Sequence, residues 1–167
     1  MLNQRRNGAR RLLFGLGFGV ILMLGAGAAL AQSAQDVQRL VAEEAARSTV
    51  PPPLALAVAR VESNFVANAQ GARGTRGVMQ IPPDLAKETY QVAADDLFDP
   101  KVNIRIGVNF LERLSQRYGS RWDLVLAHYF YGVGVDQPTP RINWEVRRYV
   151  DAVLGWPDRL FRAIGHP

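Results

Sequence analysis

LFDPKVNIRIGVNFLERLSQRYG, residues Leu97–Gly119, has the strongest helical pattern in the chain. Asp99 is suited to cap the N-terminus of a helix, and Pro100 fits the first turn that follows it. Apolar side chains then recur at intervals of four residues: Ile106, Phe110 and Leu114. Gly119 favours the left-handed conformation in which many helices end. The stretch therefore predicts a long amphipathic helix between Asp99 and Gly119.

Helical patterns also occupy most of the chain on both sides of this segment. The further predicted helices begin at Ser33 and cover Pro53–Ser63, Pro82–Tyr90, Arg121–Phe130, Trp144–Gly155 and Pro157–Ile164. Prolines at positions 51–53 separate the first two, because a proline disfavours helix in the residue before it. No segment of four or more residues alternates clearly between apolar and polar, as a half-buried strand does. With no internal repeat, the pattern predicts an all-α fold in one compact domain.

The N-terminal segment has the composition of a secretory signal. Met1–Arg11 contains four arginines and no acid, Leu12–Leu30 contains no charged residue, and Ala29–Ala31 has the small-x-small form of a signal peptidase site. We expect a signal peptide over residues 1–31 and an exported domain, residues 32–167, in the periplasm. The alternative is an uncleaved anchor that contacts the membrane, because Leu12–Ala31 has 20 residues and could just span a bilayer. The five glycines of this stretch and its small-residue exit favour cleavage.

The charge balance gives no reason to expect a nucleic-acid partner. The chain has 20 basic and 15 acidic residues and a formal net charge of +5. Four arginines lie in the predicted signal, so the remaining segment has 16 basic and 15 acidic residues and a net charge of +1. The basic character therefore belongs largely to the signal. The chain contains no Cys, so the exported domain depends on its core rather than on disulfides.

The stretch Val61–Ile81 places one carboxyl group before a glycine-rich loop. Glu62 is expected at the C-terminal end of an apolar helix, where burial and the negative end of the helix dipole both raise the pKa of a carboxyl group. A glutamate that keeps its proton near neutral pH can act as a general acid. Ser63 is placed to orient this carboxyl group, or it only ends the helix. By position alone, most glutamates at a helix end are solvated surface residues.

Four motifs resemble one known family. Glu62-Ser63, then an aromatic residue and Asn-Ala, then a glycine-rich loop ending in Met79-Gln80-Ile81, follow the spacing of the soluble-type lytic transglycosylase (SLT) family, which is related in fold to goose-type lysozyme. DPKVNIRIG, LAHYFYGVG and WEVRRYV resemble the family patterns Asp-Pro-x-x-Asn-Ile-x-x-Gly, Ala-Tyr-Asn-x-Gly and Glu-Thr-x-x-Tyr-Val. The match covers roughly residues 51–154. It implies a compact, lysozyme-like helical domain with a glycan-binding cleft.

The resemblance also implies an activity and a set of site residues. The family cleaves peptidoglycan between N-acetylmuramic acid and N-acetylglucosamine and forms a 1,6-anhydromuramic acid, with no metal and no cofactor. It implies Glu62 as the catalytic residue. Met79 is expected to offer an apolar surface to a sugar, Gln80 to supply a donor and an acceptor, and the Tyr129 hydroxyl to steer the proton of the acid. The expected substrate-binding residues are Ser63, Gly77, Met79, Gln80, Tyr129, Phe130, Glu145 and Tyr149.

One departure from the family pattern matters most for the site. Phe130 stands where the motif has an Asn, which removes an amide expected to contact the substrate. Stacking of the aromatic run on a sugar ring could compensate, and weakened or altered substrate positioning is the alternative. We expect Phe130 to be a packing residue. His128 stands in place of a small residue and is expected to pack or to hydrogen-bond rather than to bind a metal, because His166 is the only other His.

Three alternatives to this function are considered. A hydrolytic muramidase would need a second acid to activate water, and Glu145 is the candidate. A non-catalytic peptidoglycan-binding component of a secretion, conjugation or pilus system is the second, and Phe130 is the feature that favours it. An unrelated exported helical bundle requires all four motifs to be coincidental. Small exported members of the family often open the wall for envelope-spanning machines, so such a machine is an expected partner besides peptidoglycan.

Overall fold

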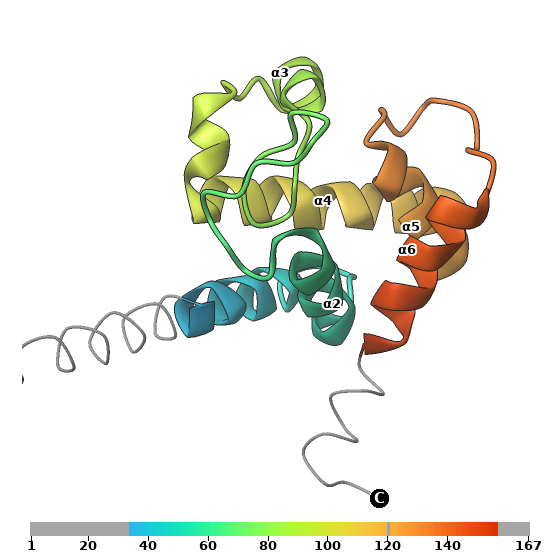
Figure 1. Cartoon of the computed structure of the whole chain (residues 1–167), viewed down its shortest axis with the longest axis horizontal. Helices are drawn as coiled ribbons and strands as arrows, with labels where there is room; N and C mark the ends of the chain where they lie inside the picture. The colour runs from blue at the N-terminus through green and yellow to red at the C-terminus, as the bar shows by residue number, and fades with distance from the viewer. Residues whose placement is uncertain (1–33, 120, 157–167) are drawn as a thin grey trace, which may run out of the picture. The chain divides into compact units, whose positions relative to one another are not determined.

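In the computed structural model, which describes residues 34–119 and 121–156, the helix α4 covers Pro100–Tyr118. It runs across the middle of the molecule in Figure 1. The carboxylate of Asp99 caps this helix by accepting hydrogen bonds from two backbone N–H groups of the first turn, at 2.8 and 3.3 Å. Gly119 ends it in the left-handed conformation, with φ +60°. Both predicted ends of this helix are confirmed.

The other helices lie where the sequence pattern predicts them. They are α2, Pro52–Ser63; α3, Pro83–Tyr90; α5, Trp122–Tyr131; and α6, Trp144–Leu154; residues 34–45 are also helical. The sequence pattern does not predict the short 3-10 helix η1, Asp95–Phe98. The described part of the chain contains no strand, only two isolated β-bridges in the loop between α2 and α3. The all-α prediction is confirmed, whereas Ser33 and Pro157–Ile164 lie outside the described residues.

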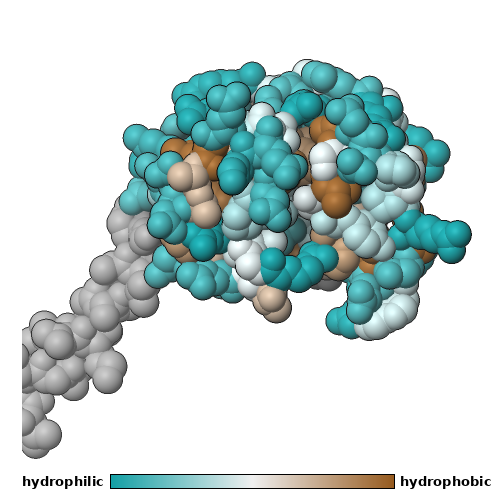
Figure 2. Space-filling model, turned by 90° about the horizontal axis from the view of Figure 1, so that it is seen from above, coloured by the Kyte–Doolittle hydropathy of each residue, from teal (hydrophilic) through white to brown (hydrophobic). Residues whose placement is uncertain are grey.

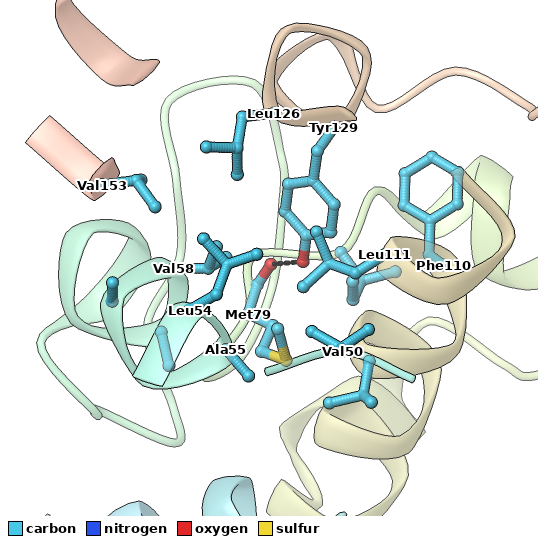
Figure 3. Close-up of a cluster of buried hydrophobic side chains, with 14 of the residues drawn as sticks. Val50, Leu54, Ala55, Val58, Met79, Phe110, Leu111, Leu126, Tyr129 and Val153 are labelled. Carbon is cyan, nitrogen blue, oxygen red and sulfur yellow. Dashed lines mark hydrogen bonds between the residues drawn. The ribbon is translucent and has the colours of Figure 1, made fainter. Parts of the chain in front are cut away.

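The helices close around one hydrophobic core. α4 packs against α5 and η1, α5 packs against α6, and α6 packs against α2. Figure 3 shows buried side chains from these four α-helices meeting in one cluster, among them Leu54, Leu111, Leu126 and Val153. On the face shown in Figure 2, hydrophobic residues form only small separate patches among hydrophilic ones. Among the described helices, none is long and apolar enough to cross a membrane.

The side-chain amide of a buried residue in α4 holds the loop that precedes α3 against this helix. The Asn103 side chain is fully buried. Its Oδ1 accepts a hydrogen bond from the backbone N–H of Met79 at 2.7 Å, and its Nδ2 donates to the carbonyl oxygens of Arg76 and Leu97 at 2.7 and 2.9 Å. Gly77 has φ +78°, and a Cβ atom there would lie 2.2 Å from this amide nitrogen. The glycine-rich loop is therefore held against α4 in one shape, and this shape positions the site.

Candidate active site

Glu62 lies in the last turn of α2 and faces a cavity of about 440 Å³. We call this cavity the cleft. Its walls come from the loop before α3, from α3 itself and from the end of α5, and they include Arg73, Gln80, Asp84, Glu88, Tyr129 and Phe130. Glu62 is partly exposed, although several residues before it in α2 are buried. The apolar helix thus brings one carboxyl group to the edge of the core.

The carboxyl group of Glu62 is held by a tyrosine from another helix. Its Oε1 accepts a hydrogen bond from the hydroxyl of Tyr149, in α6, at 2.6 Å. Burial raises the pKa of Glu62 from its ordinary 4.5 to about 7, while the Tyr149 hydrogen bond and the nearby guanidinium of Arg73 lower it. Burial raises the pKa of Tyr149 well above its ordinary value, so this hydroxyl stays a donor. Near neutral pH the Glu62 carboxyl group is available both as an acid and as a base.

Tyr129 lines the cleft with Glu62, but its hydroxyl and the Met79 side chain make other contacts than those expected from the sequence. The Tyr129 hydroxyl donates to the carbonyl oxygen of Met79 at 2.8 Å, as Figure 3 shows, and Tyr149 is the tyrosine bonded to Glu62. The Met79 side chain is fully buried, and a Cβ on Gly107 would lie 2.4 Å from its sulfur. Met79 therefore supports the loop from the core and presents no side-chain surface to a sugar.

The other predicted residues in the loop and at the end of α2 form hydrogen bonds within the protein or are buried. The Oε1 of Gln80, which lines the cleft, accepts from the Thr75 hydroxyl at 2.6 Å, and its Nε2 donates to two carbonyl oxygens of the loop at 2.9 and 3.3 Å. The Ser63 hydroxyl donates to the carbonyl oxygen of Val78 at 2.7 Å rather than to the neighbouring carboxyl group. Gly77 is buried. These residues shape the cleft by fixing the loop.

Phe130 forms a wall of the cleft together with two aromatic rings and one guanidinium. The centre of its ring lies 5.2 Å from that of Tyr149 and 5.7 Å from that of Tyr131. Arg73 lies with its guanidinium 4.8 Å from the centre of the Phe130 ring and donates to the Phe130 carbonyl oxygen at 2.8 Å. These contacts agree with the packing role expected for Phe130. The sequence reasoning missed Arg73, because nothing in its spacing relates it to α5.

Glu145 does not line the cleft. It is exposed in the first turn of α6 and lines a second cavity, of about 350 Å³, with Phe130, Trp144, Arg148, Tyr149 and Ala152. The residue considered as a second acid from the sequence therefore lies in a different cavity from the one that Glu62 lines. Asp84 and Glu88 of α3, which the sequence reasoning did not single out, line the cleft with Glu62 and are exposed.

The contacts of His128 indicate that this residue stabilises the fold. His128 is fully buried, and its ring nitrogens are hydrogen-bonded to the Tyr118 hydroxyl at 2.9 Å and to the Gly134 carbonyl oxygen at 3.1 Å. Burial lowers the pKa of His128, which favours its neutral form. Within residues 34–119 and 121–156, no group of three or more His, Cys, Asp or Glu side chains could hold a metal ion.

The family model described as the transglycosylase SLT domain matches residues 39–143, which is more than half of the chain. The chain belongs to the transglycosylase SLT domain family. Curated relatives of this SLT domain include the soluble lytic murein transglycosylase of Escherichia coli K12, 32% identical over 92 residues, and a putative soluble lytic murein transglycosylase of Haemophilus influenzae, 38% identical over 85 residues. The matches cover 51% and 47% of this chain but only 14% of each relative.

Solved structures of two relatives share the fold of this SLT domain. One is an inactive glutamate-to-glutamine variant of lytic transglycosylase Slt from Pseudomonas aeruginosa, with a TM-score of 0.63, 26% identity, and coverage of 77% of this chain and 24% of that one. The other is the 70 kDa soluble lytic transglycosylase Slt70 from Escherichia coli, with a TM-score of 0.64, 25% identity, and coverage of 76% and 24%. The predicted lysozyme-like helical fold is confirmed.

Proposed function

We propose that this SLT domain is a peptidoglycan lytic transglycosylase with Glu62 as its catalytic acid and base. The observation that carries the proposal is the setting of Glu62: a partly exposed carboxyl group at the cleft, hydrogen-bonded to Tyr149, with its pKa raised to about 7. Family membership and the named activity of the curated relatives support the same reaction. The inactive glutamate-to-glutamine variant of the Pseudomonas aeruginosa relative agrees with an essential glutamate in that protein.

The proposed reaction needs one proton carrier. Protonated Glu62 gives its proton to the glycosidic oxygen between N-acetylmuramic acid and N-acetylglucosamine, and the bond from that oxygen to C1 breaks. The muramyl N-acetyl group stabilises the positive charge that develops at C1. The Glu62 carboxylate then takes the proton of the C6 hydroxyl, whose oxygen bonds to C1 and closes the 1,6-anhydro ring. The carboxyl group is restored, and no water is consumed.

The contacts of the other site residues suggest how each one serves this reaction. Tyr149 orients the carboxyl group of Glu62 and helps to set its pKa. Gln80, Tyr129 and Phe130 line the cleft in which the glycan strand binds. Three of the predicted residues act indirectly, by holding the loop in place: Ser63, Gly77 and Met79.

We also propose where the domain works. The arginine-rich start and the uncharged stretch that follows are typical of a secretory signal over residues 1–31, so residues 32–167 form the exported domain. Because its proposed substrate is peptidoglycan, we place this domain in the periplasm. In this setting the domain opens peptidoglycan locally, during remodelling or for a secretion, conjugation or pilus machine.

Hydrolysis is the second candidate reaction, and one observation supports it. Asp84 and Glu88 line the same cleft as Glu62, so a second carboxylate that could activate a water molecule is present on α3. Both are exposed, unlike Glu62. Glu145, the sequence-based candidate for that role, lines the other cavity.

Mass spectrometry of the products from purified sacculi tests the proposal. The expected products are muropeptides that end in 1,6-anhydromuramic acid. Products with a reducing muramic acid would instead assign the domain as a hydrolase. Binding of sacculi without any soluble product would assign it as a non-catalytic peptidoglycan-binding component.

A further inference from the structure

The loop between α5 and α6, residues 132–143, forms part of the cleft wall, and the proposed reaction gives it no role. Val133, Gly134 and Gln137 of this loop line the cleft. We call residues 132–143 the cleft loop; Figure 1 shows it in orange between the labels of α5 and α6. A loop of this length without secondary structure is uncommon in a compact domain and is usually functional. None of its residues is fully buried, so its shape depends largely on hydrogen bonds from the helices.

Two side chains, one from α4 and one from α5, bind the cleft loop at two points. The His128 ring is hydrogen-bonded through Nε2 to the carbonyl oxygen of Gly134 at 3.1 Å and through Nδ1 to the Tyr118 hydroxyl at 2.9 Å. The same hydroxyl is hydrogen-bonded to the Thr139 hydroxyl at 3.2 Å. His128 is fully buried and Tyr118 is half-buried. These three bonds therefore join the core of the domain to residues 134 and 139 of the loop.

The partners of His128 fix which ring nitrogen carries the proton. A carbonyl oxygen only accepts hydrogen bonds, so Nε2 carries the proton in the bond to Gly134. Burial lowers the pKa of His128, which keeps the ring neutral and leaves Nδ1 as an acceptor for the Tyr118 hydroxyl. Only a side chain with two polar atoms at these positions can make both bonds. The family motif has a small residue here, which would make neither.

Other contacts of the cleft loop are more exposed to water. Among the described residues, Arg117 donates to the carbonyl oxygen of Val135, and the Tyr131 hydroxyl donates to that of Arg141 at 3.1 Å. Arg117 and Tyr131 are both exposed, so water competes for these two bonds. The bonds of His128 have no such competition, and they are the ones that connect the loop to the core.

We infer that His128 and Tyr118 are positioning residues for the proposed reaction, because they hold the cleft loop in the shape that receives the glycan strand. The inference rests on the proposed function and deepens it. Neither side chain is among those that line the cleft, so neither touches the substrate. They act through Gly134 and Thr139 of the loop.

The groups that react lie on other elements, which decides the kinetic consequence. Glu62 is at the end of α2, and its partner Tyr149 is in α6. Releasing the cleft loop lowers the fraction of molecules whose cleft is ready to bind, but it leaves these two residues in place. The apparent dissociation constant rises by the factor by which that fraction falls. We therefore expect a higher KM and an unchanged kcat.

Kinetics on uncrosslinked glycan strands test this with variants that each remove one hydroxyl. We expect Tyr118→Phe and Thr139→Val to raise KM by about two- to tenfold, the effect of one hydrogen bond, with kcat nearly unchanged. The double variant should match Tyr118→Phe, because Thr139 then has no bond to Tyr118 left to lose. Val41→Ala is the control: Val41 is fully buried in the helix over residues 34–45, so this change should lower the melting temperature and leave KM unchanged. A loss of kcat at unchanged KM in Tyr118→Phe would overturn the inference.

A pair of substitutions at His128 separates the bond to the loop from simple packing. The amide nitrogen of a glutamine can take the place of Nε2, whereas the shorter asparagine reaches only the place of Nδ1. His128→Gln should therefore keep the bond to Gly134 and a KM near that of wild type, while His128→Asn should raise KM as Tyr118→Phe does. Equal KM values in the two variants would mean that His128 only fills space, and would overturn the inference. Thr139→Val, on the exposed loop, keeps the test decisive if the buried substitutions prevent folding.

Limited proteolysis separates this inference from the proposed activity. Arg141 gives trypsin a cleavage site within the cleft loop, and the rate of cutting there follows the population in which the loop is released. We expect Tyr118→Phe to be cut at Arg141 about two- to tenfold faster than wild type, with the other sites unchanged, whether or not the domain cleaves glycan. Affinity for a soluble oligosaccharide of alternating N-acetylglucosamine and N-acetylmuramic acid should fall in the same variant. An unchanged rate at Arg141 would overturn the inference, and so would faster cutting with unchanged affinity and KM.

Discussion

Glu62 keeps its proton because α2 ends at the edge of the core and not at the surface. Burial is the largest influence on its pKa, and the hydrogen bond from Tyr149 opposes it only in part. Glutamine has the same size and can accept the same Tyr149 hydrogen bond, but it can neither give nor take a proton. We expect Glu62→Gln to lose glycan cleavage by roughly 10²–10⁴-fold or more while the fold and glycan binding persist. Product analysis on sacculi measures the loss, with circular dichroism and a sedimentation assay of binding as controls. Near-normal turnover would remove Glu62 from the mechanism.

The same pKa shift makes a prediction about stability. The folded domain keeps the Glu62 proton up to a pKa of about 7, whereas the unfolded chain releases it near the ordinary 4.5. Between these values the unfolded state binds fewer protons, so Glu62 lowers the free energy of unfolding as pH rises from about 4.5 to about 7. At about 1.4 kcal/mol per pKa unit, the full effect is at most roughly 3.5 kcal/mol.

Urea unfolding of wild type and Glu62→Gln at pH 4 and pH 8 measures this effect. The glutamine variant should gain stability relative to wild type on going to pH 8, by an amount on the order of 1–3 kcal/mol. All other groups titrate in both proteins, so the difference between the two curves isolates this carboxyl group. A difference that stays constant with pH would mean that the Glu62 carboxyl group titrates near its ordinary value.

Phe130 replaces an Asn of the family motif, and its contacts indicate what a change back to Asn would do. Asparagine in its place would lose the ring contacts with Tyr149 and Tyr131 and the guanidinium of Arg73 over the ring. We expect Phe130→Asn to lower the free energy of unfolding by about 1–2 kcal/mol and to give no gain in activity. Thermal unfolding and turnover of sacculi are measured together. A clear rise in turnover at an unchanged melting temperature would show that Phe130 handicaps the site.

At the scale of the elements, the sequence predicts the features that depend only on neighbouring residues, such as the ends of a helix. Asp99 and Gly119 mark the ends of α4 because caps act within one helical turn. The hydrogen bond between Tyr149 and Glu62 joins residues that are 87 positions apart in the sequence, so no local pattern could predict it. The same holds for Arg73 against Phe130. Spacing identifies which side chains belong to a motif, but only the packing of α2 against α6 decides which tyrosine reaches the acid.

The loop between α2 and α3 contains a matched pair of glycines that tests how it is fixed. Gly74 and Gly77 have φ +77° and φ +78°, so alanine is strained equally at both. A Cβ on Gly74 has no atom within 4 Å, whereas one on Gly77 would lie 2.2 Å from the Asn103 amide and 2.3 Å from the Leu97 carbonyl oxygen. We expect Gly74→Ala to cost about 1–2 kcal/mol of stability, from the left-handed backbone alone. Gly77→Ala should cost clearly more and reduce activity, because the loop must leave Asn103. Denaturant unfolding of both variants decides this, and equal losses would contradict the role given to the amide.

At the scale of the whole molecule, the folded unit extends past the C-terminal end of the family model and past the N-terminal end of the motif match. The family model ends at residue 143, but α6, which follows it, carries Tyr149, the hydrogen-bond partner of Glu62. At the other end, the motif match begins near residue 51, yet the helix over residues 34–45 already contributes to the core. Within residues 34–50, the buried side chains are Val37, Val41, Ala45 and Val50.

These buried residues predict where the domain can be cut. A fragment over residues 32–167 keeps the whole described core and should unfold cooperatively and cleave sacculi. A fragment over residues 51–167 loses four core side chains, three of them valines, and the two hydrogen bonds from Thr49 to Glu112, at 2.8 and 3.0 Å. Each buried valine is worth about 1.5–3 kcal/mol, so the loss approaches the 5–15 kcal/mol that typically separates a folded domain from its unfolded chain. We expect the shorter fragment to show no cooperative thermal transition by circular dichroism. If it unfolds at the same temperature as the longer one, the N-terminal helix is an accessory and the functional domain is the motif region alone.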